Sequence, residues 1–413
     1  MKRIVILGGG TAGTMMASHL IKRLKDDWKI IIIEPKEDHY YQPGFLFMPF
    51  GVYKEKDIVK KNRSLFPKKV DWVKERVANI DHQNNSLLLK NNEKITYDIL
   101  IIATGSHTVP QETEGLLGDL WQKSIFDFYT PEGAIKLHKA LTEFTGGDIA
   151  VHITEMPIKC PVAPLEFAFL LDSYLAKKRK IRNKTKITFV TPLSGAFTKP
   201  VASKILGHLL EEKNIHVVAD FNIEKVDNQK KCIVSYDGRE VSFDLLVTVP
   251  TNMGAKLIED SEIGDELNFV PTDKATLQAE VKENIFVLGD STNLPTSKAG
   301  SVAHFEAEIL IENILDYIND REFSHNFDGH ANCFIESGYG KAFLIDFNYL
   351  QEPVTGRFPL PKLGPLSLLK KSRLNHLGKM SFKWIYWNML LKAKKIPLVG
   401  ATMKFEGKNI KGE

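Results

Sequence analysis

The fold is decided at Gly8-Gly9-Gly10-Thr11-Ala12-Gly13, a glycine-rich stretch that follows the apolar run Ile4 to Leu7. The apolar spacing predicts a buried strand before this stretch and a helix after it. Gly8 permits a tight turn, Gly10 lets the backbone approach a pyrophosphate, and Gly13 allows the helix to pack closely on the strand. We therefore expect the helix N-terminus, at Thr11 and Ala12, to present free N–H groups to the phosphates of a dinucleotide.

A second strand, over residues 29–33, is predicted to end at Glu34, 21 positions after Gly13. An acid at this place would bind the adenosine ribose hydroxyls and repel a 2′-phosphate. A glycine motif by itself is a weak indicator, because glycine turns are common. Here strand, turn, helix, strand and acid occur in order, which predicts a dinucleotide-binding βαβ unit but does not separate FAD from NAD.

Two later segments are predicted to be buried strands that end in turns of small residues. The strand over 97–102 leads into Ala103-Thr104-Gly105, the strand over 284–288 leads into Gly289-Asp290, and a helix opens at Gly300. Together with the first motif, they resemble the flavoproteins with two dinucleotide-binding domains, the disulfide reductase superfamily. The resemblance implies that Asp290 binds the ribityl and pyrophosphate region of FAD and that the helix N-terminus stabilises reduced flavin.

This resemblance covers most of residues 1 to 320 and implies FAD as the cofactor. The implied FAD-binding residues are Gly8, Gly10, Thr11, Ala12, Gly13, Glu34, Pro35, Gln42, Val77, Ala103, Thr104, Gly105, Gly289, Asp290 and Gly300.

The second nucleotide-binding unit lacks its glycines. After a strand near residue 150 the chain continues as Ile153-Thr154-Glu155-Met156-Pro157. A backbone with side chains in this turn cannot closely approach a pyrophosphate, and Pro157 has no N–H to donate. We expect the fold to persist there, with a strand over 186–191 and a helix over 201–212. The electron donor is then expected to be something other than NAD(P)H.

Three cysteines cannot form a structural disulfide framework, so any pairing is expected to be catalytic. Cys232 is predicted to lie in a strand on a charged surface and is treated as incidental. Cys160 precedes an apolar helical run, and the helix N-terminus together with Lys159 predicts a lowered thiol pKa and a nucleophilic thiolate. Glu166, about a turn and a half later, is expected to move protons.

Cys333 precedes a predicted sharp turn at Gly338 and Gly340. Its local sequence leaves open both a buried apolar cysteine and a redox cysteine. Taken together, the two cysteine segments resemble the sulfide:quinone oxidoreductase family, in which one cysteine follows the degenerate second motif and another follows the helix after the Gly-Asp motif. Many members carry a third cysteine about 30 residues before the first. None stands at that place here, which predicts a two-cysteine subtype.

The resemblance implies a mechanism and substrates. Sulfide attacks a disulfide or sulfur bridge between Cys160 and Cys333, leaving a persulfide on one cysteine and a thiolate on the other. Two electrons then pass to FAD and on to a quinone on the opposite flavin face, and sulfur leaves as polysulfide. Glu166 and Lys341 are further implied catalytic residues. The loop 40–44, which contains Gln42, also resembles this family.

The C-terminal part of the chain is strongly basic. Residues 356–413 hold 13 Lys or Arg against two Glu, a net charge of +11, while the rest of the chain carries −7. A helix predicted over 382–392 carries Trp384, Tyr386 and Trp387, which suit the boundary of lipid headgroups. The alternative is a helix docked on the body or in a dimer interface. We favour a membrane anchor over it, because quinones reside in lipid.

These features predict an α/β fold with two Rossmann-like domains of the FAD/NAD(P)-binding type and a C-terminal amphipathic membrane-binding region. The expected segments are 1–110 (FAD-binding domain, first part), 111–250 (second domain with Cys160), 251–325 (return to the FAD-binding domain) and 326–413 (quinone- and membrane-interaction region with Cys333). We expect a peripheral, monotopic membrane protein and no secretory signal, since no cleavable apolar segment precedes the first strand.

The function predicted is that of an FAD-dependent sulfide:quinone oxidoreductase with sulfide and membrane quinone as substrates. Three alternatives stay open: a type II NADH:quinone oxidoreductase, the flavin subunit of a flavocytochrome c sulfide dehydrogenase, and a non-catalytic flavoprotein that binds sulfur carriers or proteins. A homo-oligomer is possible. No nucleic-acid motif accompanies the basic charge, and the histidine spacings fit no zinc site, so neither nucleic acid nor metal is expected.

Overall fold

The computed structural model describes residues 1–360 and 363–409. The first glycine turn belongs to an all-parallel sheet with strand order β20-β9-β1-β2-β5. Its strands are β1 (Lys2–Leu7), β2 (Trp28–Ile33), β5 (Asp71–Val73), β9 (Ile99–Ile102) and β20 (Ile285–Val287). Their apolar runs are buried because helices cover the sheet. The two helices that begin beside each other at its carboxyl edge are α1 (Thr11–Arg23) and α6 (Gly300–Ile318).

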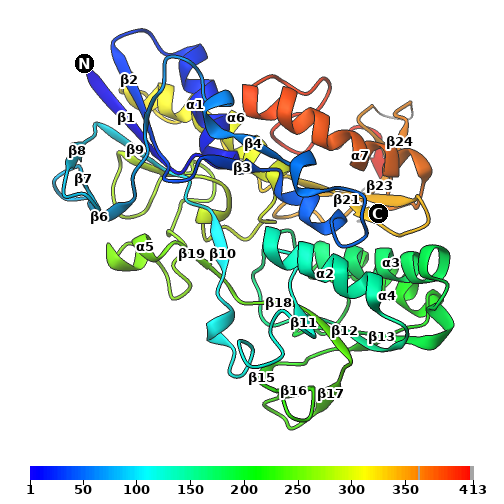
Figure 1. Cartoon of the computed structure of the whole chain (residues 1–413). Helices are drawn as coiled ribbons and strands as arrows, with labels where there is room; N and C mark the ends of the chain where they lie inside the picture. Colours follow the sequence, from blue (N-terminus) through cyan, green and yellow to red (C-terminus); the bar gives the residue numbers. More distant parts are fainter. Residues whose placement is uncertain (361–362, 410–413) are drawn as a thin grey trace.

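A second all-parallel sheet has the order β11-β18-β12-β13-β14. Its strands are β11 (Ile125–Phe126), β12 (Gly147–Ile153), β13 (Thr185–Val190), β14 (Ile215–Val218) and β18 (Leu245–Val249). The helices packed on it are α2 (Pro131–Glu143), α3 (Ala163–Tyr174) and α4 (Pro200–Glu212). In Figure 1 this green part lies below the first sheet, and β20 returns the chain to that first sheet.

Short sheets and connections complete these two units. They are β3 (Asp38–Tyr40), β4 (Val59–Lys61), β6 (Val77–Asp81), β7 (Ser86–Leu89), β8 (Lys94–Thr96), β10 (Ser106–Thr108), β15 (Ile223–Asp227), β16 (Cys232–Ser235), β17 (Glu240–Ser242), β19 (Asn252–Gly254) and α5 (Lys256–Asp260). Cys232 does lie in a strand, β16, but it is buried rather than on the surface that the sequence predicts.

The C-terminal part forms a third sheet and a helix. The sheet has the order β21-β22-β24-β23-β25, with β21 (Ala331–Glu336), β22 (Ala342–Phe347), β23 (Thr355–Phe358), β24 (Leu366–Leu368) and β25 (Lys408–Asn409). The helix α7 (Arg373–Asn388) packs on β21 and β22, and the short turn η8 (Leu390–Lys392) after it packs on α1. Figure 1 shows α7 in red beside α6 and β24.

The helix predicted over 382–392 is therefore misplaced. The structure starts α7 at Arg373 and ends it at Asn388, where Met389 leaves the helical conformation. Ser372 caps the helix, because its hydroxyl accepts a hydrogen bond of 3.0 Å from the N–H of Asn375. This Ser cap lies 12 positions before Trp384, the first of the aromatic residues on which the prediction rested.

Candidate redox and cofactor site

The turn between β1 and α1 forms an open cradle. Gly8 has a φ of +101°, and a Cβ there would lie 2.4 Å from the carbonyl oxygen of Ala103. A Cβ on Gly13 would lie 1.9 Å from the carbonyl oxygen of Gly8, so the close helix–strand packing is real. Gly10 differs, because a Cβ there would meet no atom within 4 Å. The cradle thus has room above Gly10 for a ligand to approach the backbone.

The N-termini of α1 and α6 are suited to bind a negatively charged group. Neither α1 nor α6 has a side-chain cap or an acidic residue in its first turn, so their first N–H groups stay available. A Cβ added to Gly300, at the start of α6, would lie 3.9 Å from the Thr11 methyl group. The two N-termini therefore open side by side at the same edge of the sheet.

Glu34 stands at the end of β2, next to the glycine turn. Its carboxylate accepts hydrogen bonds from the N–H of Gly9 at 2.9 Å and from that of Lys36 at 2.8 Å. These two contacts fix an acid next to the glycine turn, where the ribose of a bound dinucleotide would lie.

The other predicted cofactor residues lie at the carboxyl edge of the same sheet or near it. The 103–105 turn follows β9 and the Gly289-Asp290 turn follows β20, and the Ser291 hydroxyl joins them by accepting from Gly105 N–H at 2.7 Å. Gln42 accepts at 3.3 Å from the Lys159 ammonium, so the 40–44 loop reaches the Cys160 segment. Val77 opens β6 and is half-buried against the apolar cluster beneath the first sheet.

Cys160 lies in a strained loop just before α3. It has a φ of +46°, which costs a non-glycine residue of order 1 kcal/mol. Its N–H donates to the Lys298 carbonyl at 2.7 Å. The Tyr129 hydroxyl donates to the Lys159 carbonyl at 2.8 Å and lies 3.4 Å from that of Cys160. The strained backbone is thus held from two sides.

The predicted lowering of the Cys160 pKa is wrong. Burial raises the pKa of this thiol well above its ordinary value, Glu166 adds to the rise, and Lys379 opposes it. The N–H of Ala163, at the start of α3, donates to the Cys160 carbonyl at 2.8 Å, and its lowering effect on the thiol pKa is smaller than the rise from burial. Lys159 points to Gln42 instead. The lysine adjacent in sequence is therefore not the lysine that acts on the thiol.

Cys333 lies on β21, which packs against both α3 and α6. The two cysteines, 173 positions apart, are free thiols near each other, and Cys333 contributes to the raised pKa of Cys160. Burial raises the pKa of Cys333 to about 12, while Lys379 and the Ser301 hydroxyl oppose the rise. Ser301 also donates to the Asn332 carbonyl at 2.9 Å, which holds the start of β21 against α6.

A buried ion pair stands beside the cysteines. Glu166, on α3, is fully buried, and its two carboxylate oxygens lie 2.8 and 3.1 Å from the Lys379 ammonium of α7. Glu166 also accepts at 2.7 Å from the N–H of Glu336. Burial alone would lower the pKa of Lys379, but the charges of Glu166 and Cys160 raise it, so this lysine stays protonated. Burial raises the pKa of Glu166 in spite of Lys379.

Lys379 is the site residue that sequence reasoning missed. It is one of 13 basic residues after Gly356, and nothing in its local sequence distinguishes it from the others. The lysine predicted instead, Lys341, is exposed in the turn between β21 and β22, beyond the end of the strand that carries Cys333.

Two aromatic residues of the predicted anchor are docked on the cofactor cradle. The Tyr386 hydroxyl lies 2.7 Å from the Thr11 hydroxyl and 2.6 Å from Nε2 of His39, and Trp387 is 5% exposed. Burial lowers the pKa of His39 to about 4, so this ring is neutral. It donates through Nδ1 to the Gly9 carbonyl at 3.2 Å and accepts from Tyr386. The placement of Tyr386 and Trp387 at lipid headgroups is thus wrong, because the Tyr386 hydroxyl bonds to the cradle and the Trp387 ring packs against His39.

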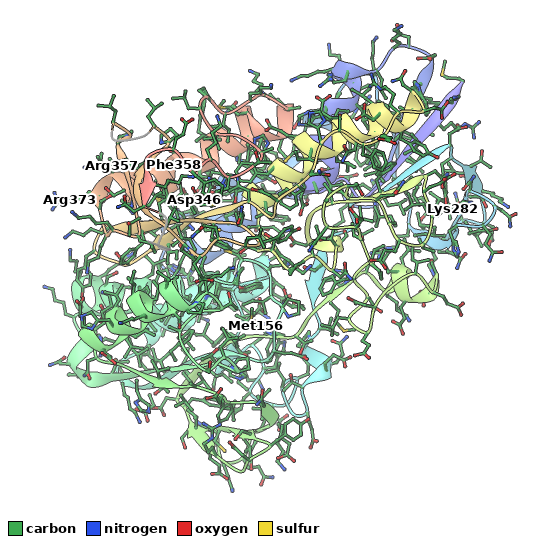
Figure 2. The ribbon with its side chains drawn as sticks, turned by 180° about the vertical axis from the view of Figure 1, so that it is seen from behind. Met156, Lys282, Asp346, Arg357, Phe358 and Arg373 are labelled. Carbon is green, nitrogen blue, oxygen red and sulfur yellow. The ribbon has the colours of Figure 1, made fainter. Side chains whose placement is uncertain are left out.

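The outer side of α7 is apolar and exposed. Leu374, Leu377 and Trp384 are 51%, 60% and 62% exposed and lie at helical spacing on one stripe. Arg357 and Arg373 lie at the outer edge of the C-terminal region, as Figure 2 shows. Across the described ranges 1–360 and 363–409, every helix is too short or too polar to span a bilayer.

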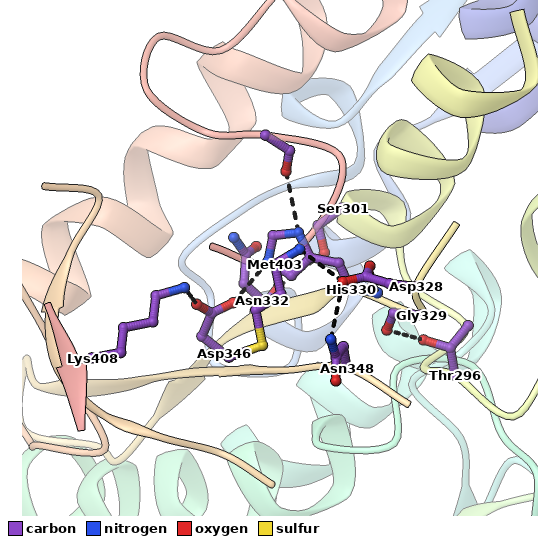
Figure 3. A network of polar contacts seen from close by, with 11 residues as sticks. Thr296, Ser301, Asp328, Gly329, His330, Asn332, Asp346, Asn348, Met403 and Lys408 are labelled. Atoms are coloured by element: carbon purple, nitrogen blue, oxygen red, sulfur yellow. Dashed lines mark hydrogen bonds and ion pairs between the residues drawn. The ribbon is translucent and has the colours of Figure 1, made fainter. Parts of the chain in front are cut away.

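A second buried network holds the C-terminal segment next to Cys333. Asp346 of β22 pairs with Asn332, and its carboxylate accepts from Nε2 of His330 at 2.8 Å and from the Lys408 ammonium. Figure 3 shows Lys408 and His330 reaching Asp346 from different sides. Nδ1 of His330 also lies 3.2 Å from the Gly400 carbonyl. The segment after α7 is thereby fixed to the sheet that carries Cys333.

The comparisons with known proteins agree with this architecture. Residues 2–307 match the family described as pyridine nucleotide-disulphide oxidoreductase. The chain is 29% identical to the mitochondrial sulfide:quinone oxidoreductase of Dictyostelium discoideum, over 95% of this chain and 86% of that protein. It is 28% identical to the corresponding protein of Mus musculus, over 94% and 86%. The structure of the sulfide:quinone oxidoreductase of Aquifex aeolicus superimposes with a TM-score of 0.79 at 23% identity, over 94% of this chain and 92% of that one.

Proposed function

Because this chain belongs to the pyridine nucleotide-disulphide oxidoreductase family, we propose that it is an FAD-dependent sulfide:quinone oxidoreductase. The observation that carries the proposal is the meeting of Cys160 and Cys333 beside the buried Glu166–Lys379 pair, next to the dinucleotide cradle. Once oxidised to a disulfide, a cysteine pair so placed can take up sulfide by exchange, and bound FAD would then accept the two electrons. The similarity to curated sulfide:quinone oxidoreductases over nearly the whole chain supports the same activity.

The residues of the cradle fit FAD. The open space above Gly10 and the uncapped N-termini of α1 and α6 suit a pyrophosphate and an electron-rich ring, and Glu34 suits the ribose hydroxyls. When bound, FAD would supply the two-electron acceptor for sulfur oxidation and the donor for quinone. The 154–157 turn after β12 has no glycine, which argues against NAD(P)H as the source of electrons.

Cys160 and Cys333 perform the sulfur chemistry. In the oxidised enzyme a bond joins their two sulfurs, and HS⁻ attacks one of them. The new S–S bond makes a persulfide on that cysteine, the old S–S bond breaks, and the second cysteine leaves as a thiolate. Lys379 lowers the pKa of both thiols and so stabilises this thiolate. Burial still leaves the pKa of each thiol raised on balance, so Lys379 reduces the tendency of the thiolate to take up a proton without removing it.

The exposed stripe of α7 is the membrane-binding face in this proposal. Leu374, Leu377 and Trp384 would enter the headgroup boundary, and the basic residues of the C-terminal region would attract anionic lipid. The protein would then lie on the membrane as a peripheral enzyme. The docked side of α7 ends at the cradle and at Lys379, so the helix would connect the lipid phase, where quinone resides, to the site.

Steady-state electron transfer tests the function. Purified holoenzyme is mixed anaerobically with a short-chain quinone and either sulfide or NADH, and quinol formation is followed. We expect sulfide to support turnover and NADH to fail. Turnover with NADH and not with sulfide would identify a type II NADH:quinone oxidoreductase instead, and turnover with neither would leave a flavoprotein without this activity.

A further inference from the structure

A row of ionisable side chains leads from the cysteines to the surface. Glu166 is fully buried beside Cys160, Lys379 contacts it, and Glu336 and His376 continue outward. Nδ1 of His376 lies 2.8 Å from Oε1 of Glu336, and the side chain of His376 is 29% exposed. Lys379 and His376 stand three positions apart on α7, so they share the face that packs on β21. The row therefore begins at the fully buried Glu166 and ends at the partly exposed His376.

Glu336 is the unusual member of this row. Its side chain is 1% exposed, and Oε2 is buried with no hydrogen-bond partner in the described part of the chain. A buried carboxylate oxygen without a partner is costly, and native proteins rarely keep one without a use. Burial raises the pKa of this carboxyl, while His376 and Lys379 lower it. Such a group can hold a proton on one oxygen while the other keeps its bond to His376.

Stability alone does not account for the row. Buried charged groups give little net stabilisation compared with apolar side chains of similar volume. Titratable groups that face it from other elements are Tyr41 and Tyr129, on whose pKa the charge of Glu166 acts, and Tyr53, near Asp57. The Lys383 ammonium lies 4.2 Å from the centre of the Tyr53 ring. Burial raises the pKa of Tyr53, so its phenol stays protonated. In the described structure, His376 is the solvent-facing end of the row; its links are hydrogen bonds except between Lys379 and the Glu336 carboxylate, where the lysine charge lowers the pKa of the carboxyl from nearby.

Resting on the proposed function, we propose that Glu336 and His376 form a proton port, which exchanges protons between solvent and the Glu166–Lys379 pair at the cysteines. Neutral H₂S enters the site and gives one proton to the Glu166 carboxylate, leaving HS⁻ to attack sulfur. Glu166 passes this proton to Lys379 as Lys379 gives one of its own to Glu336. His376 takes the proton from Glu336 and releases it to water. No electrons move in these steps, and each donor regains its starting state.

Two variants and a control test the port. His376→Gln and Glu336→Gln interrupt it, while His208→Gln changes a 71% exposed histidine on α4. Each holoenzyme is mixed anaerobically with sulfide, and the rate of flavin reduction is measured in acid solution, where sulfide is mainly H₂S, and in alkaline solution, where it is mainly HS⁻. The acid series is repeated with added imidazole, and bound FAD is measured from its absorbance.

We expect both port variants to keep FAD and to be slower than wild type by about tenfold or more in acid solution, because one acid–base group is lost. In alkaline solution sulfide is already HS⁻, so no proton has to leave the site and both variants should match wild type. Imidazole should restore His376→Gln, whose place is open to solvent, and not Glu336→Gln, whose place is buried. His208→Gln should behave as wild type throughout.

Wild-type rates in both variants at both pH values would overturn the port. Equal slowing at both pH values without rescue by imidazole, or loss of FAD from both variants, would indicate a structural role and would also overturn it. Failure of sulfide to reduce the wild-type flavin at either pH would count against the proposed function itself, and is thus distinguishable from failure of the port.

Discussion

At the scale of single residues, the site depends on charges placed where water is excluded. Lys379 is the clearest example, because one ammonium contacts both oxygens of Glu166 and the carbonyl of Phe334 at 3.0 Å. Its partner is fully buried, so solvent cannot replace the lysine if it is removed. Removing Lys379 leaves the buried Glu166 carboxyl without its counter-ion, so it must either keep an unpaired charge or take up a proton.

We predict that Lys379→Met lowers the free energy of unfolding by about 3–5 kcal/mol, because the buried Glu166 loses its counter-ion. Urea unfolding of the holoenzyme measures this change. Lys341→Met, at an exposed position, is the matched control and should change stability by no more than about 0.5 kcal/mol. A loss in Lys379→Met no greater than that in the control would contradict the account of this ion pair.

At the scale of elements, α7 is the helix that joins the parts of the site. Its inner side brings Lys379 to the cysteines and Tyr386 to the glycine turn, and its outer side is the exposed stripe of Leu374, Leu377 and Trp384. Tyr386 donates to neutral His39 and accepts from Thr11. The Tyr386 hydroxyl thus fixes both Thr11, in the first turn of α1, and the His39 ring, which bonds to the Gly9 carbonyl.

We predict that Tyr386→Phe weakens FAD binding by about fivefold to tenfold, since hydrogen bonds worth about 1 kcal/mol are lost next to the cradle. Equilibrium dialysis of the holoenzyme measures the FAD dissociation constant. Tyr236→Phe, at a 76% exposed tyrosine in the second domain, should leave it unchanged. The prediction fails if FAD is retained equally by both variants.

The features that the sequence predicts are local, and those that it misses depend on contacts between distant parts of the chain. The glycine turn and Glu34 are predictable because they belong to one βαβ unit, and β9 and β20 are predictable because each is a continuous apolar run. The meeting of Cys160 and Cys333 depends on packing between α3, α6 and β21, and only the family resemblance indicated it. Aromatic residues on α7 suit both a lipid surface and an aromatic core, so sequence alone could not separate docked Tyr386 from exposed Trp384.

The prediction of a lowered pKa for Cys160 was wrong for a similar reason. The chain neighbour Lys159 turns away to Gln42, while Lys379, more than 200 positions later, comes to the thiol. Local sequence also cannot reveal that the first N–H of α3 is used by a carbonyl. Burial of the thiol by the folded chain, which outweighs Lys379, therefore decides the sign of the shift in thiol pKa.

At the scale of the whole molecule, burial of neutral histidines links stability to pH. Burial lowers the pKa of His19, His39 and His304 to about 4 and that of His152 to about 3. In the unfolded chain these rings take up protons near pH 6.5. Between pH 6.5 and 4 the unfolded chain therefore binds more protons than the folded one, and stability falls as the pH falls. Glu306 opposes this, because burial raises its pKa to about 7 and its contribution is lost as the pH rises through 7.

We predict that the free energy of unfolding decreases from pH 7 to pH 5, with a slope near pH 5 of about 1.4 kcal/mol per pH unit for each buried histidine, less the contribution of Glu306. Urea unfolding at pH 7, 6 and 5 gives this slope. Stability that stays constant or increases over this range would show that the histidines are not held neutral by burial.

The second property of the whole molecule is its proposed attachment to a membrane. We predict that Leu377→Ser combined with Trp384→Ser removes most binding to anionic liposomes, because each apolar side chain contributes about 1.5–3 kcal/mol when buried in lipid. Flotation with vesicles measures binding, and bound FAD serves as the check on folding. Tyr236→Ser is the matched control. Undiminished flotation of the double variant would exclude this face as the attachment site.

The central claim is that Cys160 and Cys333 carry electrons from sulfide to the flavin. It is tested most directly by mixing holoenzyme anaerobically with sulfide in a stopped-flow instrument and following the visible flavin absorbance of wild type, Cys160→Ser, Cys333→Ser and the control Cys232→Ser. We predict that all four bind FAD, that sulfide bleaches the wild type and the control, and that each site variant loses the fast bleaching. Bleaching at the wild-type rate in both site variants would contradict the two-cysteine mechanism.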